Sequence, residues 1–182
     1  MESELLSKKR DALPRNLPHR SAMKKTHLDF RITGLDPSPF VHLYGLSDSE
    51  LGRAGIVRLF ADAPVGYPDR IGMRDVQPGE SVLLCHFEHL TTRSPYRSSH
   101  AIFIREFAMH RYDECNSVPD VMRIRMLSVR AYDELDMMLD AELVAGRELE
   151  RCIERLFSND AVSYLHAHNA VRGCYSGRID RG

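Results

Sequence analysis

The sequence lacks any apolar run that approaches the roughly 20 residues needed to cross a lipid bilayer, so we expect no membrane partner. It also lacks a charge imbalance. The 25 Lys and Arg against 26 Asp and Glu give no general reason to expect binding to nucleic acid. Cysteine is scarce, and none of Cys85, Cys115, Cys152 and Cys174 forms a CxxC pair. We therefore expect a cytoplasmic protein with reduced thiols and no disulfide framework.

Several motifs that mark common enzyme classes are missing as well. The chain has no phosphate-binding loop, no dinucleotide-binding fingerprint, no HExxH metalloprotease motif and no GxSxG nucleophile elbow. It has no internal repeat and no low-complexity tract. These absences leave open whether the protein is an enzyme, which cofactor it uses and how it oligomerises. A non-enzymatic interaction or structural module is an equally weighted alternative.

What is present fits an ordinary globular protein. The chain has 182 residues, of which 43% are hydrophobic and 28% charged, so it suits one domain with its own core. Residues 1–26 differ, with seven Lys and Arg against three Asp and Glu and little apolar pattern. We expect a disordered basic tail there, with Met23 as a candidate alternative start, and a single domain over residues 27–182.

Alternating apolar and polar residues predict several strands. The first begins near Leu28, and others are expected over 56–61, 81–90, 100–107 and 121–131. Ser47 and Glu50 form a capping box that predicts a short helix, and the segment 77–79 (Gln-Pro-Gly) predicts a turn.

One clearly helical segment follows. Leu149, Cys152, Ile153 and Leu156 recur at three- and four-residue spacing, which predicts a helix over about 146–157. The pattern of residues 134–145 does not decide between an extension of this helix and another element. A closing β-hairpin is expected from about residue 161 onward. Because strands cluster and seldom alternate with helices, we predict an α+β fold with a largely antiparallel sheet.

The closing hairpin carries the most chemistry. On a strand, His166 and His168 share one face while Asn169 lies on the other. The return strand brings Cys174 near them, but a shift of one residue in register would invert its face. One hypothesis is a nucleophilic site, with Cys174 as the reactive thiol, His168 or His166 as the base and Asn169 orienting it. The alternative is a structural role, in which these residues are buried packing and hydrogen-bonding groups. We expect that structural role for Cys85 and Cys152.

Two further site types are open. A metal site would use His166 and His168, because imidazoles two residues apart on a strand can reach one ion. It would need further ligands from a distant segment, such as His86, Glu88, His89 or His100. An anion-binding pocket would use arginines, whose guanidinium groups suit carboxylates and phosphates. The candidates are Arg93, Arg97, Arg105, Arg123, Arg125, Arg172 and Arg178; exposed arginines of this kind commonly pair with neighbouring acids instead.

Three segments together resemble a bacterial family described only as a domain of unknown function. They are residues 67–80 (YPDRIGMRDVQPGE), the block 82–106 and residues 164–181 (YLHAHNAVRGCYSGRIDR), and the resemblance extends over about 28–181. It implies one compact bacterial domain and no established activity. The pattern of the family emphasises Arg70, Glu88, His89, Tyr96, Arg105, His168, Asn169, Gly173, Cys174 and Arg178. This chain departs from it at Asp69, where cysteine is frequent, and at 100–101, where glycine-proline is frequent.

We therefore predict a pocket where the strands of 82–106 meet the closing hairpin, and a small anionic molecule as its ligand. Arg105 and Arg178 would bind the anion, and His168, Asn169 and Cys174 would supply any chemistry. The ligand-binding residues suggested by residue type and resemblance are Arg97, Arg105, Arg178, Glu88 and His89.

Overall fold

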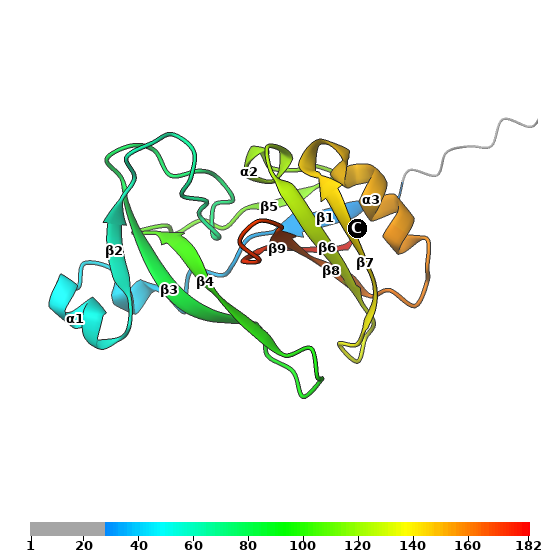
Figure 1. Cartoon of the computed structure of the whole chain (residues 1–182), viewed down its shortest axis with the longest axis horizontal. Helices are drawn as coiled ribbons and strands as arrows, with labels where there is room; N and C mark the ends of the chain where they lie inside the picture. The colour runs from blue at the N-terminus through cyan, green and yellow to red at the C-terminus, as the bar shows by residue number, and fades with distance from the viewer. Residues whose placement is uncertain (1–27) are drawn as a thin grey trace, which may run out of the picture.

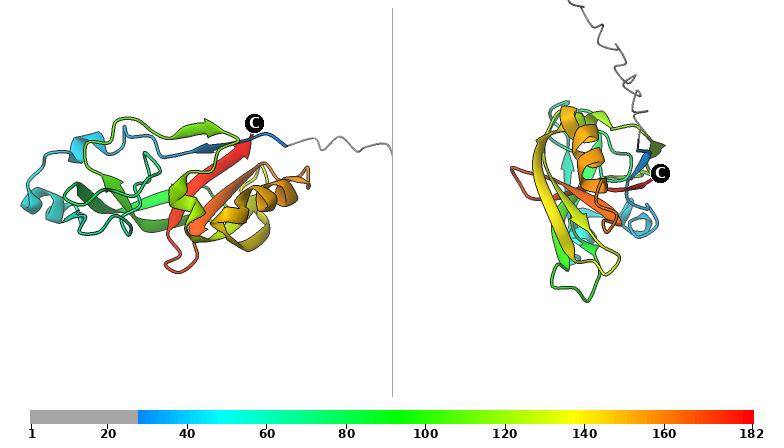
Figure 2. Two further views of the ribbon diagram at one scale, coloured as in Figure 1. Left: turned by 90° about the horizontal axis from the view of Figure 1, so that it is seen from above. Right: turned by 90° about the vertical axis from the view of Figure 1, so that its right-hand side faces the viewer.

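Two antiparallel sheets build the computed structural model, which describes residues 28–182 (Figures 1 and 2). The larger sheet has six strands in the order β5-β1-β9-β8-β6-β7: β1 (Phe30–Thr33), β5 (Asp113–Cys115), β6 (Met126–Tyr132), β7 (Met138–Ala145), β8 (Tyr164–Asn169) and β9 (Tyr175–Arg181). The smaller sheet has the order β2-β3-β4: β2 (Val57–Phe60), β3 (Ser81–Leu90) and β4 (Ser98–Arg105). The predicted tail, residues 1–26, lies outside the described residues.

The predicted α+β class is confirmed, as are the main helix and the closing hairpin. Helix α3 (Leu149–Phe157) follows a 3-10 turn, η2 (Gly146–Glu148), and buries its predicted apolar stripe. Short helix α1 (Asp48–Arg53) starts at the predicted capping box: the Ser47 side chain accepts from the backbone of Glu50, and the Glu50 side chain accepts from the backbone of Ser47. The remaining short helices are η1 (Val41–Leu43) and α2 (Asp120–Arg123).

The expected strand over 121–131 is wrong in its first half. Residues 120–123 form α2, which follows Pro119 in an extended conformation, and β6 starts only at Met126. Arg125 points back across the junction, where its guanidinium donates to the Asp75 carboxylate (2.7 and 2.9 Å) and to the Val121 carbonyl (2.7 Å). The undecided segment 134–145 contains β7 and so does not extend the helix.

Strand β8 is buried because both of its faces are covered. Leu165 and Ala167 point to one side, where they join Ile153 and Leu156 of α3 in the largest apolar cluster. Tyr164, His166 and His168 point to the other side, where the rings of His166 and His168 contact His89 of the β3–β4 hairpin. A strand that reads as alternating polar and apolar is therefore buried along its full length.

None of the helices within residues 28–182 combines the length and the apolar character that crossing a membrane requires.

Candidate functional site

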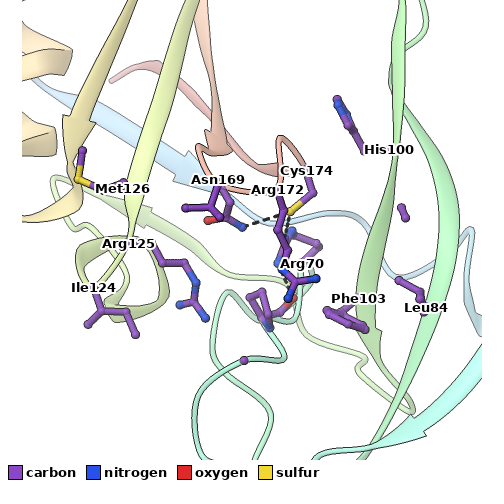
Figure 3. Close-up of a pocket in the computed structure, with 14 residues that line it drawn as sticks. Arg70, Leu84, His100, Phe103, Ile124, Arg125, Met126, Asn169, Arg172 and Cys174 are labelled. Atoms are coloured by element: carbon purple, nitrogen blue, oxygen red, sulfur yellow. Dashed lines mark hydrogen bonds between the residues drawn. The ribbon is translucent and has the colours of Figure 1, made fainter.

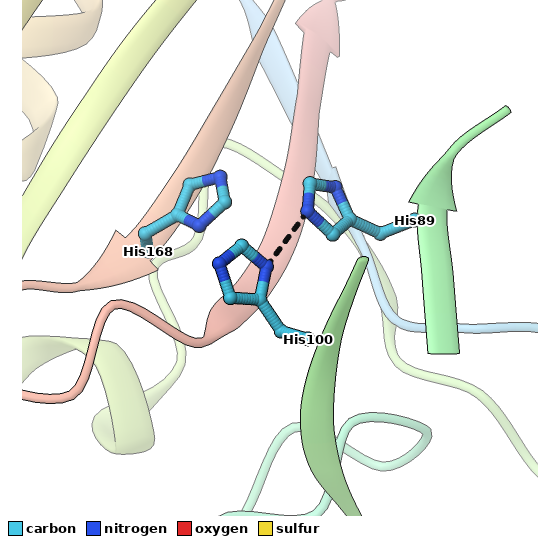
Figure 4. A group of neighbouring side chains, drawn as sticks. All are labelled: His89, His100 and His168. Atoms are coloured by element: carbon cyan, nitrogen blue, oxygen red, sulfur yellow. Dashed lines mark hydrogen bonds between the residues drawn. The ribbon is translucent and has the colours of Figure 1, made fainter. Parts of the chain in front are cut away.

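A cluster of histidines fills the junction between the two sheets. His89 comes from β3, His100 from β4 and His168 from β8, and one ring nitrogen of each lies within 4.8 Å of the others (Figure 4). His89 lies at a β-bulge, where Glu88 pairs with Ser99 and Leu90 with Ser98. The bulge adds a residue to β3 and redirects the side chain at that position. The His89 ring is stacked on that of Tyr175 of β9, with ring centroids 4.6 Å apart.

These imidazoles are held in the neutral form. Burial lowers the pKa of His89 to about 4, that of His168 to about 3 and that of His166 to about 2, since charging a group away from water is costly. Burial also lowers the pKa of His100, and the nearby positive charge of Arg130 adds to the shift. Four neutral rings therefore face each other at neutral pH.

Their hydrogen bonds are incomplete. The Nε2 atom of His89 lies 3.0 Å from Nδ1 of His100 and 3.2 Å from the Ser98 hydroxyl. The Nδ1 atom of His168 lies 3.1 Å from the Gly173 carbonyl oxygen. Within residues 28–182, three buried ring nitrogens have no partner: Nδ1 of His89, Nδ1 of His166 and Nε2 of His168. Such orphaned atoms are rare in folded proteins and call for an explanation.

A cavity of about 790 Å³ adjoins this cluster (Figure 3). His100 belongs to both, since it also lines the cavity. Apolar side chains form part of the wall: Leu84, Phe103, Ile124 and Met126. The polar lining comes from Arg70, Arg125, Asn169, Arg172 and Cys174. A mostly apolar hollow of this size with a few converging polar groups is typical of a small-molecule site.

Arg70 is the most unusual residue of the cavity wall. Only 2% of its surface is exposed, and its guanidinium donates to the carbonyl oxygens of Pro68 and Tyr175 and to Sγ of Cys174, the last at 3.3 Å. Within the described part of the chain, no carboxylate forms an ion pair with it. The adjacent Asp69 carboxylate instead accepts from backbone N–H groups of Ile71 (3.2 Å), Gly72 (2.7 Å) and Arg105 (2.9 Å). Burial lowers the pKa of Arg70.

The register of the hairpin separates Cys174 from His168. His168 pairs with Tyr175 and Ala167 with Gly177, so Ser176 is an extra residue at a bulge in β9. Tyr175 consequently lies on the histidine side, whereas Sγ of Cys174 accepts from Nδ2 of Asn169 at 3.4 Å. The structure thus brings Cys174, Asn169 and Arg70 together, and it directs His168 to the other histidines.

The remaining predicted ligand residues lie outside the cavity wall. Arg97 forms an ion pair with Glu88 on the β3–β4 hairpin. Arg178 bonds to Asp180 and lies over the ring of Tyr164, 3.9 Å from its centroid. The guanidinium of Arg105 lies 3.8 Å from Glu80.

Sequence reasoning underrates two contributors to the site. Arg70 is prominent in the family resemblance but is not among the predicted ligand residues, because one arginine in a loop carries no periodic signal. Tyr175 has no predicted role beyond packing. Neither bulge is visible in the alternation of residues, and each changes which side chains meet.

These features define a class of protein: an α+β domain of two antiparallel sheets, with a histidine-filled junction beside a cavity. Within that class, the chain belongs to the family described as "Protein of unknown function (DUF1203)", whose model matches residues 66–181. The match begins downstream of Leu28, where we expected it to start, and it includes the histidine junction and the whole cavity wall. No curated protein and no solved structure matches the chain.

Proposed function

We propose that this protein binds a small anionic molecule, with a carboxylate or phosphate group on an apolar body, in the cavity between its sheets. The observation that carries the proposal is Arg70, a buried cation in the cavity wall that lacks a carboxylate partner among residues 28–182. A buried charge is costly unless an opposite charge accompanies it, and a bound anion would supply one.

The rest of the lining supports this chemistry. Arg125 is already neutralised by Asp75, with 2.7 Å between the charged atoms, so it serves the fold. Arg172 is exposed in the hairpin turn and lines the cavity, so its charge is available to a ligand. The Oδ1 atom of Asn169 is buried without a hydrogen-bond donor in the described chain, and a protonated or hydroxyl group of a ligand would satisfy it. The four free cysteines support the cytoplasmic location we expect.

The test uses phenyl phosphate as the probe and phenol as its uncharged analogue. We expect phenyl phosphate to raise the melting temperature of the full chain at constant ionic strength, and phenol to have a much smaller effect, because a ligand that binds the native state stabilises it. Isothermal titration should show that Arg172→Ala weakens binding by about 10-fold or more, the usual scale for a hydrogen bond to a charged group.

Arg147→Ala is the matched control, because Arg147 of η2 is an exposed arginine that does not line the cavity. It removes the same charge from the protein and should leave binding unchanged. Equal stabilisation by phenol, or equal losses in the two arginine variants, would contradict the proposal.

A further inference from the structure

The histidine junction contains a set of nitrogen atoms that the anion-binding proposal does not use. His89, His100 and His168 come from three strands and two sheets, yet their ring nitrogens converge within 4.8 Å. Nδ1 of His89 and Nε2 of His168 are buried without a hydrogen-bond partner within residues 28–182. Unsatisfied buried atoms of this kind call for an explanation.

His168 is arranged as a metal ligand would be. A backbone carbonyl only accepts hydrogen bonds, so the contact of 3.1 Å to Gly173 requires the proton of the ring to be on Nδ1. Nε2 then carries a lone pair, is buried, and has no donor within residues 28–182. Metal-binding histidines usually hold their other ring N–H on a carbonyl or carboxylate in this way, which fixes the ring and its tautomer.

His89 and His100 complete the set from the smaller sheet. Their facing nitrogens are 3.0 Å apart, close to the spacing of about 3.3 Å expected for two nitrogens on a tetrahedral zinc ion with bonds of about 2.0–2.1 Å. The widest separation in the trio is at most 4.8 Å, so a shift of roughly 1.5 Å in side-chain position would close the site.

We propose that His89, His100 and His168 form a binding site for a divalent transition metal ion of the zinc type. Three neutral imidazoles with no carboxylate or thiolate in the trio suit Zn²⁺, Cu²⁺, Ni²⁺ and Co²⁺ and disfavour Mg²⁺ and Ca²⁺. Three protein ligands leave a fourth position for water or a ligand, and His100 places the ion at the edge of the cavity.

A neighbouring positive charge limits the expected strength of the site. The positive charge of Arg130 lowers the pKa of both His100 and His168, so it also opposes a bound cation. We therefore expect weaker binding than at a structural site with four ligands.

The test uses the full chain, stripped with a chelator and then equilibrated with ZnCl₂ or CoCl₂. We expect one Zn²⁺ ion per chain after desalting, and for Co²⁺ the intense visible bands of a tetrahedral complex. Because the ligands span both sheets, Zn²⁺ should also raise the melting temperature.

Losing a residue that only hydrogen-bonds to a metal ligand typically weakens metal binding by about 10–100-fold. His100→Gln and His89→Gln each remove a ligand itself, so each should weaken Zn²⁺ binding by at least that factor. His100 and His89 are only partly buried, and circular dichroism will verify that both variants are folded. His86→Gln is the matched control, since His86 lies on the same strand and is exposed; it should bind as the wild type does.

Absence of stoichiometric Zn²⁺ in the wild type, or unchanged binding in both ligand variants, would overturn the proposal. The anion-binding proposal is judged separately: phenyl phosphate is titrated in the presence of chelator, and Arg172→Ala is expected to leave Zn²⁺ binding intact. Each proposal can therefore fail while the other stands.

Discussion

At the scale of single residues, the four cysteine thiols differ in their exposure to solvent. Cys85 and Cys152 are 4% and 2% exposed, and burial raises their pKa to about 11 and about 12. Cys115 is exposed on the edge strand β5, and Cys174 is partly exposed in the cavity wall. Because thiol reagents attack the accessible thiolate, we predict that only Cys115 and Cys174 react in the native protein at neutral pH.

The measurement is the number of thiols labelled by a small disulfide reagent before and after unfolding, with two expected in the native state and four in denaturant. Cys115→Ser isolates the rate of Cys174. The nucleophile hypothesis requires this rate to exceed that of a small free thiol in solution, and a slower Cys174 argues against it. Native labelling of Cys152 would mean that α3 packs loosely on the larger sheet and opens readily.

Residue identities predict the site only in part. Asn169 and Cys174 are recognisable from their types and do lie in the cavity wall, whereas Arg105 and Arg178 pair with acids elsewhere. The reason is that a sequence displays which side chains are present but not which carboxylate is close enough to neutralise an arginine. That depends on contacts between residues distant in the chain.

At the scale of elements, Gly146 allows the connection between β7 and α3 to pack closely against the backbone of α2. A Cβ atom on Gly146 would lie 1.9 Å from the Met122 carbonyl oxygen and 2.8 Å from Cα of Arg123, and these backbone atoms cannot move without shifting α2. We predict that Gly146→Ala lowers the free energy of unfolding by at least about 2 kcal/mol, as overpacking against rigid backbone does.

Gly52 offers a control for this substitution because it lies in α1, and a Cβ atom added to it would meet no atom within 4 Å. Alanine there removes the entropy cost of glycine in a helix, so Gly52→Ala should be neutral or stabilise by up to about 1 kcal/mol. Urea denaturation gives both values. A Gly146→Ala protein as stable as the wild type would show that α2 is not held tightly against η2.

Element types are predictable where the pattern is periodic and poorly predictable where a tertiary contact overrides it. The stripe of α3 and the capping box of α1 are local signals, and both are present in the structure. Residues 121–125 alternate like a strand, yet they follow Pro119 and Asp120, which begin a helix, and Arg125 is drawn to Asp75. The proline-acid pair is the available signal for this break.

At the scale of the whole molecule, fold class follows from the clustering of strands, but the split into two sheets does not. A sequence gives the order of the strands and not their partners. The hairpin formed by β3 and β4 packs on the face of β8 opposite α3, so β8 is buried on both sides and its histidines lie at the junction. The candidate metal site is therefore a consequence of sheet packing, which no local pattern encodes.

We expect a buried ion pair between Glu106 and Arg58 to control the acid stability of the protein. Glu106, which follows β4, accepts from the Arg58 guanidinium on β2 (2.8 and 2.9 Å) and from the backbone N–H of Gly45 (3.0 Å). The carboxylate side chain is only 3% exposed. The hydrogen bond from Arg58 lowers the pKa of Glu106 from its ordinary value of 4.5 to about 2.

This lowered pKa fixes the sign of the pH effect. Above pH of about 4.5 the carboxylate is ionised in both the folded and the unfolded chain, so its full contribution of about 3 kcal/mol is present. As the pH falls from there toward 2, the unfolded chain binds a proton more readily than the folded one, and the contribution is lost.

We predict that Glu106→Gln is less stable than the wild type at neutral pH and that the difference shrinks steadily below pH of about 4.5. Urea denaturation at several pH values measures it, with Glu134→Gln, an exposed glutamate on the turn before β7, as the control that should follow the wild type. A constant difference between Glu106→Gln and the wild type across this range would show that Glu106 titrates alike in the two states and that the pair does not control acid stability.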